Sequence, residues 1–415
     1  MRGVTFRVSL PRYAIARSVG RLSSYFLTGG LSGLGLEDLE PPVIPGPDWV
    51  KLDVVACGIC GSDLSALRYT ASPALEPFAS FPAVLGHEIL GHVSEIGPGV
   101  THVKPGQRAV VDPMISCTTR GFPSEECCPS CSEGLHATCA RAGEDGVTKM
   151  AGQPLSPGLA IGYHRDLPGG WGEQVIAHRS QVFPVPDDLS DNAAVLSEPL
   201  SVALHAVLRN LPGENASVFV IGSGAIALGT VWALRATGFE GPLVAQVRRP
   251  PESDLALALG ATEVISSGPE ARQSLIETGA SAYLPPVGPE VYAGGGFSLV
   301  FDCVGSPESL DQALRYAAPR GRVVLEGCAS LVRDLDLTFL WARELEVRGS
   351  VGYGREEWNG SNRHTFEVVH ELLVDGNAPV ERMVTHVFPL SEYRDALRAA
   401  STHAKSGAIR VVLRP

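Results

Sequence analysis

A glycine-rich turn between a buried strand and a buried helix constrains this chain more than any other feature. The apolar run Val218–Ile221 leads directly into Gly222-Ser-Gly-Ala-Ile-Ala227, which opens a helical pattern over 226–236. The first glycine permits a tight turn, the second lets the backbone approach a pyrophosphate, and the small Ala227 lets helix and strand pack closely. Free N–H groups at the helix start favour phosphate. The turn predicts a dinucleotide site, the alternative being a βα turn without a ligand. The predicted binding residues are Gly222, Ser223, Gly224, Ala225 and Ile226.

Strands and helices alternate from residue 216 to about residue 349. Short apolar runs are separated by helical patterns, the runs lying at 218–221, 243–247, 263–265, 298–301 and 322–325. This order predicts an α/β fold with a doubly wound parallel sheet. The uncharged stretch Asn215–Leu234 is long enough for a membrane span. Glycines interrupt that stretch, so a strand, a turn and a helix explain it better, and we expect no membrane segment.

The end of the second strand indicates which nicotinamide cofactor the chain prefers. NAD requires an Asp or Glu about 20 residues past the glycines, where the carboxylate bonds the ribose hydroxyls. The chain has Gln246-Val-Arg248-Arg249-Pro there, and no carboxylate precedes Glu252. Two guanidinium groups pair well with a 2′-phosphate. Arg248 and Arg249 therefore predict NADP(H) in preference to NAD(H). The alternative is that both are solvated and that NAD binds less selectively.

Five of the nine cysteines lie between Cys117 and Cys139. This clustering indicates metal binding in a reducing compartment, hence a cytoplasmic protein, rather than a disulfide framework. Cys128, Cys131 and Cys139 have metal-ligand spacing, and Cys117 can supply a fourth thiolate. Four thiolates without an open position are typical of structural zinc. Neighbouring residues rarely both reach one ion, so Cys127 and Cys128 are alternatives, and we choose Cys128.

A second group of zinc ligands precedes this cysteine cluster. Cys60 follows the predicted strand 50–56, and His87 comes 27 residues later in Gly86-His-Glu88. A thiolate and an imidazole are preferred zinc ligands, and a catalytic site keeps one position open. Asp63 could orient one of the ligands. Taken singly, the cysteine and the histidine are also explained as a buried strand-end residue and a loop residue.

Composition excludes several classes of protein. Apolar residues make up 44% and charged residues 19% of the 415 residues, so the chain is not disordered. A net charge of −12 without a basic stripe disfavours nucleic acid and anionic membranes as partners. The first 36 residues carry arginines and no acid, as transit peptides do: Arg2, Arg7, Arg12, Arg17 and Arg21. No apolar signal core is present, and a strand over Val4–Leu10 explains the segment better.

A series of motifs runs in one order from about residue 50 to residue 353. They are Gly58-Ile-Cys-Gly-Ser-Asp63, Leu85-Gly-His-Glu-Ile-Leu-Gly91, the cysteine cluster, Gly169-Gly-Trp-Gly-Glu173, Glu198-Pro-Leu200, the glycine turn and Phe301-Asp-Cys-Val-Gly305. This combination resembles the zinc-containing medium-chain dehydrogenases/reductases, the alcohol dehydrogenase superfamily.

The resemblance implies a two-domain organisation. A GroES-like β-barrel catalytic domain, split in sequence, would comprise residues 1–198 with the structural-zinc lobe and residues 350–415. A Rossmann domain would occupy 199–349, with the active site in the cleft. Family members associate through their Rossmann sheets, so a homodimer or homotetramer is expected.

The resemblance also implies roles for individual residues. Cys60 and His87 match the catalytic zinc ligands, Glu88 follows as the residue that can approach or exchange onto the metal, and Glu198 takes the third-ligand position. Glutamate there, in place of cysteine, resembles the polyol, sugar, threonine and butanediol dehydrogenase branch. Ser62 would take the proton of the alcohol. The remaining matches are Val304 and Gly305 for the cofactor and Cys117, Cys128, Cys131 and Cys139 for structural zinc.

Two departures from the family pattern affect these assignments. Ten residues separate Cys117 from Cys128, where relatives have a shorter spacing, so the cysteine lobe carries an insertion. Many relatives carry a histidine three residues after the Ser/Thr of the proton relay, and this chain has Ser65. The proton exit path is therefore expected to run through water.

The sequence thus predicts hydride transfer between NADP(H) and a secondary alcohol, polyol or sugar, with one catalytic and one structural zinc. One alternative is an NAD-dependent threonine- or sorbitol-type dehydrogenase. A second is a dehydrogenase-fold protein that binds NADPH without turnover. A cysteine-rich zinc module that binds nucleic acid or protein is disfavoured by the net charge of −12.

Overall fold

A computed structural model describes residues 1–19, 29 and 32–415, so Arg21 lies outside the described residues. The chain divides into two compact units. The first comprises Met1–Glu198, Tyr353–Asp375 and Val384–Pro415, and the second comprises Pro199–Gly352 and Gly376–Met383. Each unit is described by itself below.

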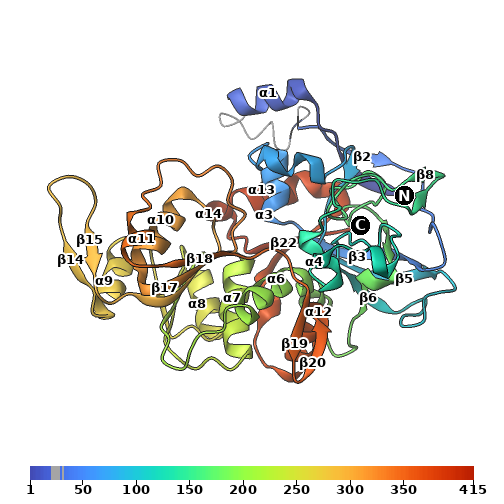
Figure 1. Cartoon of the computed structure of the whole chain (residues 1–415). Helices are drawn as coiled ribbons and strands as arrows, with labels where there is room; N and C mark the ends of the chain where they lie inside the picture. The colour runs from blue at the N-terminus through green and yellow to red at the C-terminus, as the bar shows by residue number, and fades with distance from the viewer. Residues whose placement is uncertain (20–28, 30–31) are drawn as a thin grey trace. The chain divides into compact units, whose positions relative to one another are not determined.

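Six parallel strands form the sheet of the second unit, in the order β13-β12-β11-β16-β17-β18. Their bounds are β11 Val218–Ile221, β12 Leu243–Gln246, β13 Glu263–Ile265, β16 Phe297–Asp302, β17 Ala317–Leu325 and β18 Glu346–Gly349. The helices are α7 Ala225–Ala236, α8 Pro250–Ala258, α9 Pro269–Glu277, α10 Pro307–Tyr316 and α11 Thr338–Ala342 (Figure 1). The predicted doubly wound parallel sheet is confirmed.

The strand order reverses between β11 and β16, which is where such sheets bind ligands. All four residues of β11 are buried, as expected of a central strand covered on both faces. Phe219 of β11 stacks on Phe297 of β16, with ring centroids 4.7 Å apart. The uncharged stretch 215–234 contains β11 and most of α7. Within the described part of the chain, no helix has both the length and the apolar character needed to span a membrane.

The first unit is built on a mixed seven-stranded sheet in the order β10-β6-β5-β3-β22-β21, with β9 paired to β3. Their bounds are β3 Trp49–Gly58, β5 Ile89–Ile96, β6 Arg108–Val111, β9 Gln174–His178, β10 Val182–Pro184, β21 Val384–Pro389 and β22 Arg410–Arg414. Two register shifts between β3 and β5 bend the long central strand. As a result β3 pairs with β5, β9 and β22.

Shorter elements complete the first unit. A three-stranded sheet has the order β2-β1-β4, with β1 Arg2–Phe6, β2 Leu34–Asp38 and β4 Ala83–Val84. The helices are α1 Leu10–Val19, α3 Gly61–Leu67, α4 Pro129–Ser132, α5 Asp191–Ala194, α12 Thr365–Asp375, α13 Tyr393–Ser401 and α14 His403–Ser406. The pairs β7 Lys149–Met150 with β8 Gln153–Pro154 and β19 Arg355–Trp358 with β20 Ser361–His364 form hairpins. Helix α6, Ser197–Leu208, begins in the first unit and belongs to the second unit from Pro199 onward.

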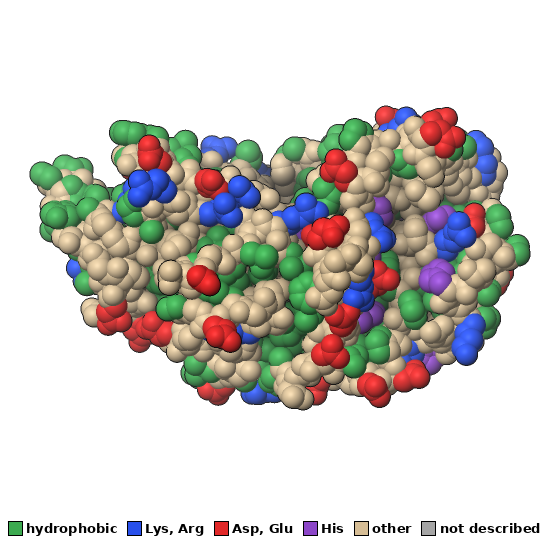
Figure 2. All heavy atoms as spheres, turned by 60° about the horizontal axis from the view of Figure 1, so that its bottom comes forward, with side chains coloured by type: hydrophobic (Ala, Val, Ile, Leu, Met, Phe, Trp, Pro, Cys, Tyr) green, Lys and Arg blue, Asp and Glu red, His purple; other side chains and the backbone are tan. Residues whose placement is uncertain are grey.

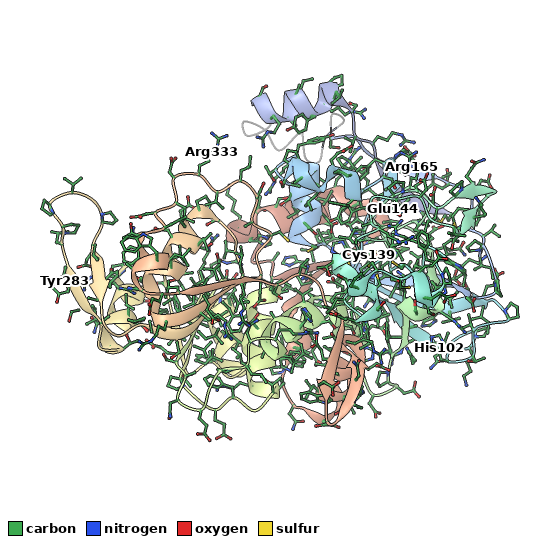
Figure 3. All side chains as sticks on the ribbon, viewed as in Figure 1. His102, Cys139, Glu144, Arg165, Tyr283 and Arg333 are labelled. Atoms are coloured by element: carbon green, nitrogen blue, oxygen red, sulfur yellow. The ribbon has the colours of Figure 1, made fainter. Side chains whose placement is uncertain are left out.

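Three local predictions require correction. The predicted strand Val4–Leu10 ends at Phe6, and α1 begins at Leu10, because Pro11 suits the first turn of a helix and not a strand. The sequence pattern predicts a short helix over Asp254–Leu259, whereas helix α8 starts at Pro250 for the same reason. The hairpin of β14 (Ser281–Tyr283) and β15 (Val291–Ala293) was not predicted, because prolines and glycines fill its loop; Tyr283 is labelled in Figure 3.

Charged side chains of both signs are interspersed on the face shown in Figure 2.

At the N-terminus, Arg2 pairs with Glu173 at 2.8 Å and Arg7 pairs with Glu37. These arginines therefore tie the first strand to its neighbours, as a folded segment would.

Candidate metal and cofactor sites

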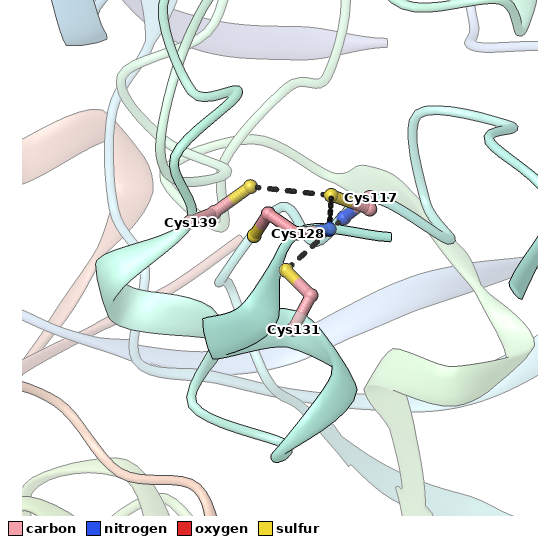
Figure 4. A group of neighbouring side chains, drawn as sticks. All are labelled: Cys117, Cys128, Cys131 and Cys139. Carbon is pink, nitrogen blue, oxygen red and sulfur yellow. Dashed lines mark hydrogen bonds between the residues drawn. The ribbon is translucent and has the colours of Figure 1, made fainter. Parts of the chain in front are cut away.

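Four cysteine sulfurs converge in the lobe between β6 and β9 (Figure 4). The sulfurs of Cys117, Cys128, Cys131 and Cys139 all lie within 4.8 Å of one another, and those of Cys117 and Cys139 are 3.7 Å apart. Four thiolates at the usual zinc–sulfur distance of about 2.3 Å form a tetrahedron with edges of about 3.8 Å. The spacing therefore fits a closed tetrahedral zinc site.

Backbone N–H groups point at these sulfurs, as they do around thiolates. The N–H of Cys128 lies 3.4 Å from the Cys117 sulfur, and the N–H of Ala140 lies 3.4 Å from the Cys128 sulfur. A hydrogen bond from the Cys131 thiol is the main cause that lowers the pKa of Cys139 to about 5. The Cys127 sulfur instead faces the carbonyl of Pro123 at 3.6 Å and lies outside the group.

The insertion between Cys117 and Cys128 folds back on itself. The N–H of Phe122 donates to the carbonyl of Cys117 at 3.0 Å, and the guanidinium of Arg141 lies 4.1 Å from the Phe122 ring centroid. The loop thus returns the chain to the cluster, and the ten intervening residues do not separate the sulfurs of Cys117 and Cys128. Buried Arg120 anchors the lobe by donating to four backbone carbonyls: Ala142, Glu144, Ser156 and Gly158.

A second cluster brings together the ligand atoms of Cys60, His87 and Glu88, all within 4.8 Å of one another. Cys60 sits at the end of β3 as the N-cap of α3, and the other two residues lie between β4 and β5. Glycine is required on both sides of this cluster. A Cβ at Gly58 would overlap the Glu88 carboxylate, and one at Gly86, where φ is +93°, would overlap Trp171.

Asp63 supports this cluster through its contacts with Cys60 and His87. It is fully buried, and its Oδ2 accepts the N–H of Cys60 at 2.9 Å. Its Oδ1 lies 3.4 Å from Nδ1 of His87, which leaves Nε2 for a metal. Burial opposes a charge on His87, but Asp63 and Cys60 outweigh it and raise the pKa of His87 well above its usual value.

Arg410, on the last strand, is the buried cation of this cluster and was not predicted. Its Nη1 lies 2.7 Å from Oε1 of Glu88 and 3.0 Å from the carbonyl of Ile59. The second oxygen of Glu88 is buried and has no hydrogen-bond partner among the described residues. The cluster therefore keeps a free carboxylate oxygen next to a thiol and an imidazole, which is a donor set that zinc prefers.

Glu198 lies in the first turn of α6 and is buried, but its carboxylate is outside the 4.8 Å group. Burial, followed by the charges of neighbours including Glu88, raises its pKa to about 7. The fully buried Tyr353 lies beside it, and burial with the charge of Glu198 raises the pKa of that phenol. The structure thus brings three of the four predicted catalytic-site ligands together and holds Glu198 close by.

The hydroxyl of Ser62 has a partner that the sequence did not reveal. Tyr163 places its hydroxyl 3.0 Å from Oγ of Ser62 and 2.6 Å from Oδ1 of Asp63. The Tyr163 ring also lies against His87, with centroids 5.5 Å apart.

The glycine turn of the second unit has the geometry expected of a phosphate-binding loop. Gly222 has φ of +137°, and a Cβ there would lie 3.1 Å from the Cβ of Ala227. Gly224 is the N-cap of α7, and a Cβ there would meet nothing within 4 Å, so the space above it is open to a ligand. The Ala225 side chain is buried, which leaves its backbone to face that space, while Ser223 and Ile226 are half-buried.

A pocket of about 210 Å³ adjoins this turn, and Gly222, Gln246, Arg248 and Val304 are among its lining residues. Asp302 fixes the backbone of this loop at Val304 and Gly305, because its Oδ1 accepts the N–H groups of both residues at 3.0 Å each. Gly305 has φ of +71°, and a Cβ there would lie 2.8 Å from the N of Ala329.

The two predicted 2′-phosphate arginines differ in their surroundings. Arg248 is exposed and lines the pocket. Arg249 is the N-cap of α8 and bonds the buried Glu252. Gln246 and Gln312, both on the pocket wall, form a reciprocal amide pair at 3.0 and 2.6 Å. An amide pair therefore stands where an NAD enzyme would present a ribose-binding carboxylate.

Comparison with known proteins assigns the family. Residues 46–187 match the alcohol dehydrogenase GroES-like domain, and residues 225–366 match the zinc-binding dehydrogenase model. L-idonate 5-dehydrogenase of Vitis vinifera is 30% identical over 387 residues, covering 92% of this chain and 93% of that protein. The chain belongs to the zinc-containing medium-chain dehydrogenases.

Other relatives of this dehydrogenase agree with the assignment. Sorbitol dehydrogenase of Arabidopsis thaliana is 29% identical over 392 residues, covering 92% of this chain and 93% of that protein. A solved structure described as a zinc-binding dehydrogenase of Sinorhizobium meliloti, bound to NADP, is 27% identical with a TM-score of 0.70 and covers 100% of this chain and 99% of that one. The dehydrogenase is a zinc-dependent alcohol oxidoreductase of the polyol dehydrogenase branch that acts on a small molecule.

Proposed function

We propose that this dehydrogenase transfers hydride between NADP(H) and a secondary alcohol, polyol or sugar at the Cys60 centre. The observation that carries the proposal is that the ligand atoms of Cys60, His87 and Glu88 lie within 4.8 Å of one another. One carboxylate oxygen of this Glu88 has no hydrogen-bond partner among the described residues. Three ligands rather than four thiolates leave room for a substrate oxygen, as in catalytic zinc sites. The relatives named for idonate and sorbitol support a polyhydroxylated substrate.

Zinc at this centre would lower the pKa of an alcohol and stabilise the charge that develops on its oxygen. Cys60, Nε2 of His87 and the nearby Glu198 would hold the metal. Asp63 keeps His87 in the required tautomer. Glu88 stays paired with Arg410 and can approach the metal through its free oxygen. Ser62 would accept the alcohol proton and pass a proton on toward water.

A second zinc would be structural and would be held by the four cysteines of the lobe. Their mutual spacing supports this role, because four thiolates leave no position for a substrate. The many free thiols also support a reducing compartment, which we propose is the cytoplasm.

The preference for NADP(H) would rest mainly on Arg248. It lines the pocket beside the glycine turn, whereas Arg249 is engaged by Glu252. The backbone of Gly222–Ile226 would bind the pyrophosphate, and Val304 with Gly305 would close the pocket. The Gln246–Gln312 pair offers no carboxylate to the ribose hydroxyls, which disfavours an NAD-linked threonine- or sorbitol-type enzyme.

Initial rates with NADP⁺ and NAD⁺ against secondary alcohols, polyols, sugars and L-threonine, with and without a zinc chelator, test this function. We expect chelator-sensitive reduction of NADP⁺. Arg248→Ala should raise the Kd for NADP⁺ by about 10- to 100-fold, the effect of losing a charge-assisted hydrogen bond, and should leave NAD⁺ binding unchanged. Arg249→Ala should raise the Kd for NADP⁺ by a smaller factor. Equal binding of both cofactors to the native chain would contradict the assignment.

We propose that two copies associate through β18. This strand is the edge of the six-stranded sheet and all four of its residues are exposed, as is the neighbouring Trp341. An exposed edge strand pairs readily with a second copy. Light scattering after size exclusion should give a dimer or tetramer mass, and Val347→Pro should shift it toward the monomer.

A further inference from the structure

The hydroxyl of Tyr163 lies between two polar side chains of the Cys60 centre. It is 3.0 Å from Oγ of Ser62 and 2.6 Å from Oδ1 of Asp63. The backbone of Tyr163 is fixed on both sides, because its N–H donates to the carbonyl of Ala160 at 3.2 Å and its carbonyl accepts the N–H of Ser80 at 2.9 Å. The phenol therefore has a defined position against both partners.

A phenol has one proton, so it can donate to only one of these partners. The carboxylate of Asp63 is an acceptor, and its other oxygen is already occupied by the N–H of Cys60 at 2.9 Å. The shorter of the two hydrogen bonds of Tyr163 is the one to Asp63. The phenol therefore donates its hydrogen bond to Asp63, and its oxygen is left to accept a hydrogen bond from the Ser62 hydroxyl.

We propose that Tyr163 is a positioning residue that turns the Ser62 hydroxyl. The Ser62 proton points to Tyr163, and a lone pair of Ser62 Oγ is left open toward a hydrogen-bond donor, the hydroxyl of an alcohol substrate. This inference rests on the proposed role of Ser62 and adds the residue that sets its direction. Position 65, where many relatives carry a histidine, is serine, and the orienting residue here lies 101 positions from Ser62 in the sequence.

Tyr163→Phe removes the hydroxyl and keeps the ring against His87. We expect kcat for alcohol oxidation to fall about tenfold, the effect of losing one well-placed hydrogen bond. The KM for the alcohol, the Kd for NADP⁺ and the zinc content should stay within about twofold, as expected when only a transition-state contact is lost. Turnover is expressed per zinc-loaded chain, so that a loss of folded protein cannot imitate the effect.

Tyr69→Phe is the matched control, because the Tyr69 hydroxyl is buried in the same unit and makes no side-chain hydrogen bond within the described part of the chain. This variant should keep the native kcat. A tenfold loss in Tyr69→Phe as well would show that any buried tyrosine hydroxyl matters, and it would overturn the specific role of Tyr163.

The double variant Ser62→Ala/Tyr163→Phe separates positioning from a general structural role. If Tyr163 acts through Ser62, the double variant should be no slower than Ser62→Ala alone. If Tyr163→Phe costs the same factor in both backgrounds, or costs nothing in the native one, the inference is overturned while the zinc dehydrogenase assignment stands. Full turnover of Ser62→Ala would instead overturn the proposed role of Ser62 itself and the inference with it.

Discussion

The two cysteine-containing centres of the first unit each have ligand atoms within 4.8 Å of one another but are assembled in different ways. The four-cysteine group comes from one segment, residues 117–139, and its ligands are separated only by turns and short helical elements, the α-helix α4 and two 3-10 helices. The Cys60 centre draws on the ends of β3 and β4 and on Arg410 of β22. A segment can close around its own metal locally, whereas the Cys60 centre exists only when distant strands pair.

Removing one thiol from each centre should give the largest difference between the two centres, a loss of turnover at one and a loss of stability at the other. Cys60→Ala should lower kcat at least about a thousandfold, because the Lewis acid contributes several kcal/mol and each 1.36 kcal/mol is tenfold. Its Tm should change little, since the strands and Asp63 remain. Cys131→Ala should instead lower the Tm and release the lobe to proteolysis. Turnover, zinc per chain and thermal unfolding measure both variants, and a stable Cys131→Ala with normal zinc would contradict the structural role.

Arg410 tests whether the Cys60 centre depends on a distant charge. Arg410→Met leaves Glu88 buried without its cation, which should reduce the free energy of unfolding by about 3–5 kcal/mol. Arg398→Met is the matched control, because the Arg398–Asp395 pair is exposed and such pairs contribute about 0–1 kcal/mol. Urea denaturation of both variants decides the point. Equal, small losses would mean that Glu88 is adequately solvated without Arg410.

A buried carboxyl of the second unit sharpens the contrast with Glu88. Glu326 has no cation as a partner among the described residues: Thr230 Oγ1 lies at 3.0 Å and the Cys303 thiol is nearby, and burial, with the charge of Asp302, raises its pKa to about 8. A carboxyl whose folded-state pKa is raised stabilises the fold at low pH, and that stability is lost as pH rises toward the folded-state pKa. The free energy of unfolding should therefore fall by about 2 kcal/mol between about pH 5.5 and 7.5 from this group, at up to 1.36 kcal/mol per pH unit.

Glu326→Gln should remove that part of the pH dependence, because the amide does not titrate. Unfolding by urea at several pH values measures the slope for the native chain and the variant. An unchanged slope in Glu326→Gln would show that Glu326 does not titrate in this range.

The local patterns of the chain predicted much of the fold and of the sites. The alternation after residue 216 predicted the parallel sheet, and the boundaries of β11 and β13 agree with the predicted runs. The cysteine spacing pointed to the four sulfurs that converge, because ligands within one segment leave a readable interval. Segments rich in proline, such as the start of α8, were less readable, since proline both opens helices and breaks them.

Residues that act across the chain were not predictable. Arg410 lies 322 positions from Glu88, and nothing in the sequence near either residue announces the pair. Tyr163 contacts Ser62 from a loop 101 positions away. Arg248 and Arg249 looked equivalent in the sequence, and only the helix cap and Glu252 distinguish them. Residue type and spacing suffice to predict the ligands of a site built from one segment. Residues that reach a site from distant parts of the chain are identified only once the pairing of the strands is known.

The position of β22 bears on how the protein is made. Residues 410–414 form a strand between β3 and β21, inside the sheet rather than at its edge, and they carry the arginine that neutralises Glu88. During synthesis the N-terminal residues leave the ribosome first. The four-cysteine lobe can therefore take up its metal on the growing chain, while the Cys60 centre cannot form until residues 410–414 have been translated. Nascent chains stalled before residue 410 should accordingly carry the first metal and lack the second.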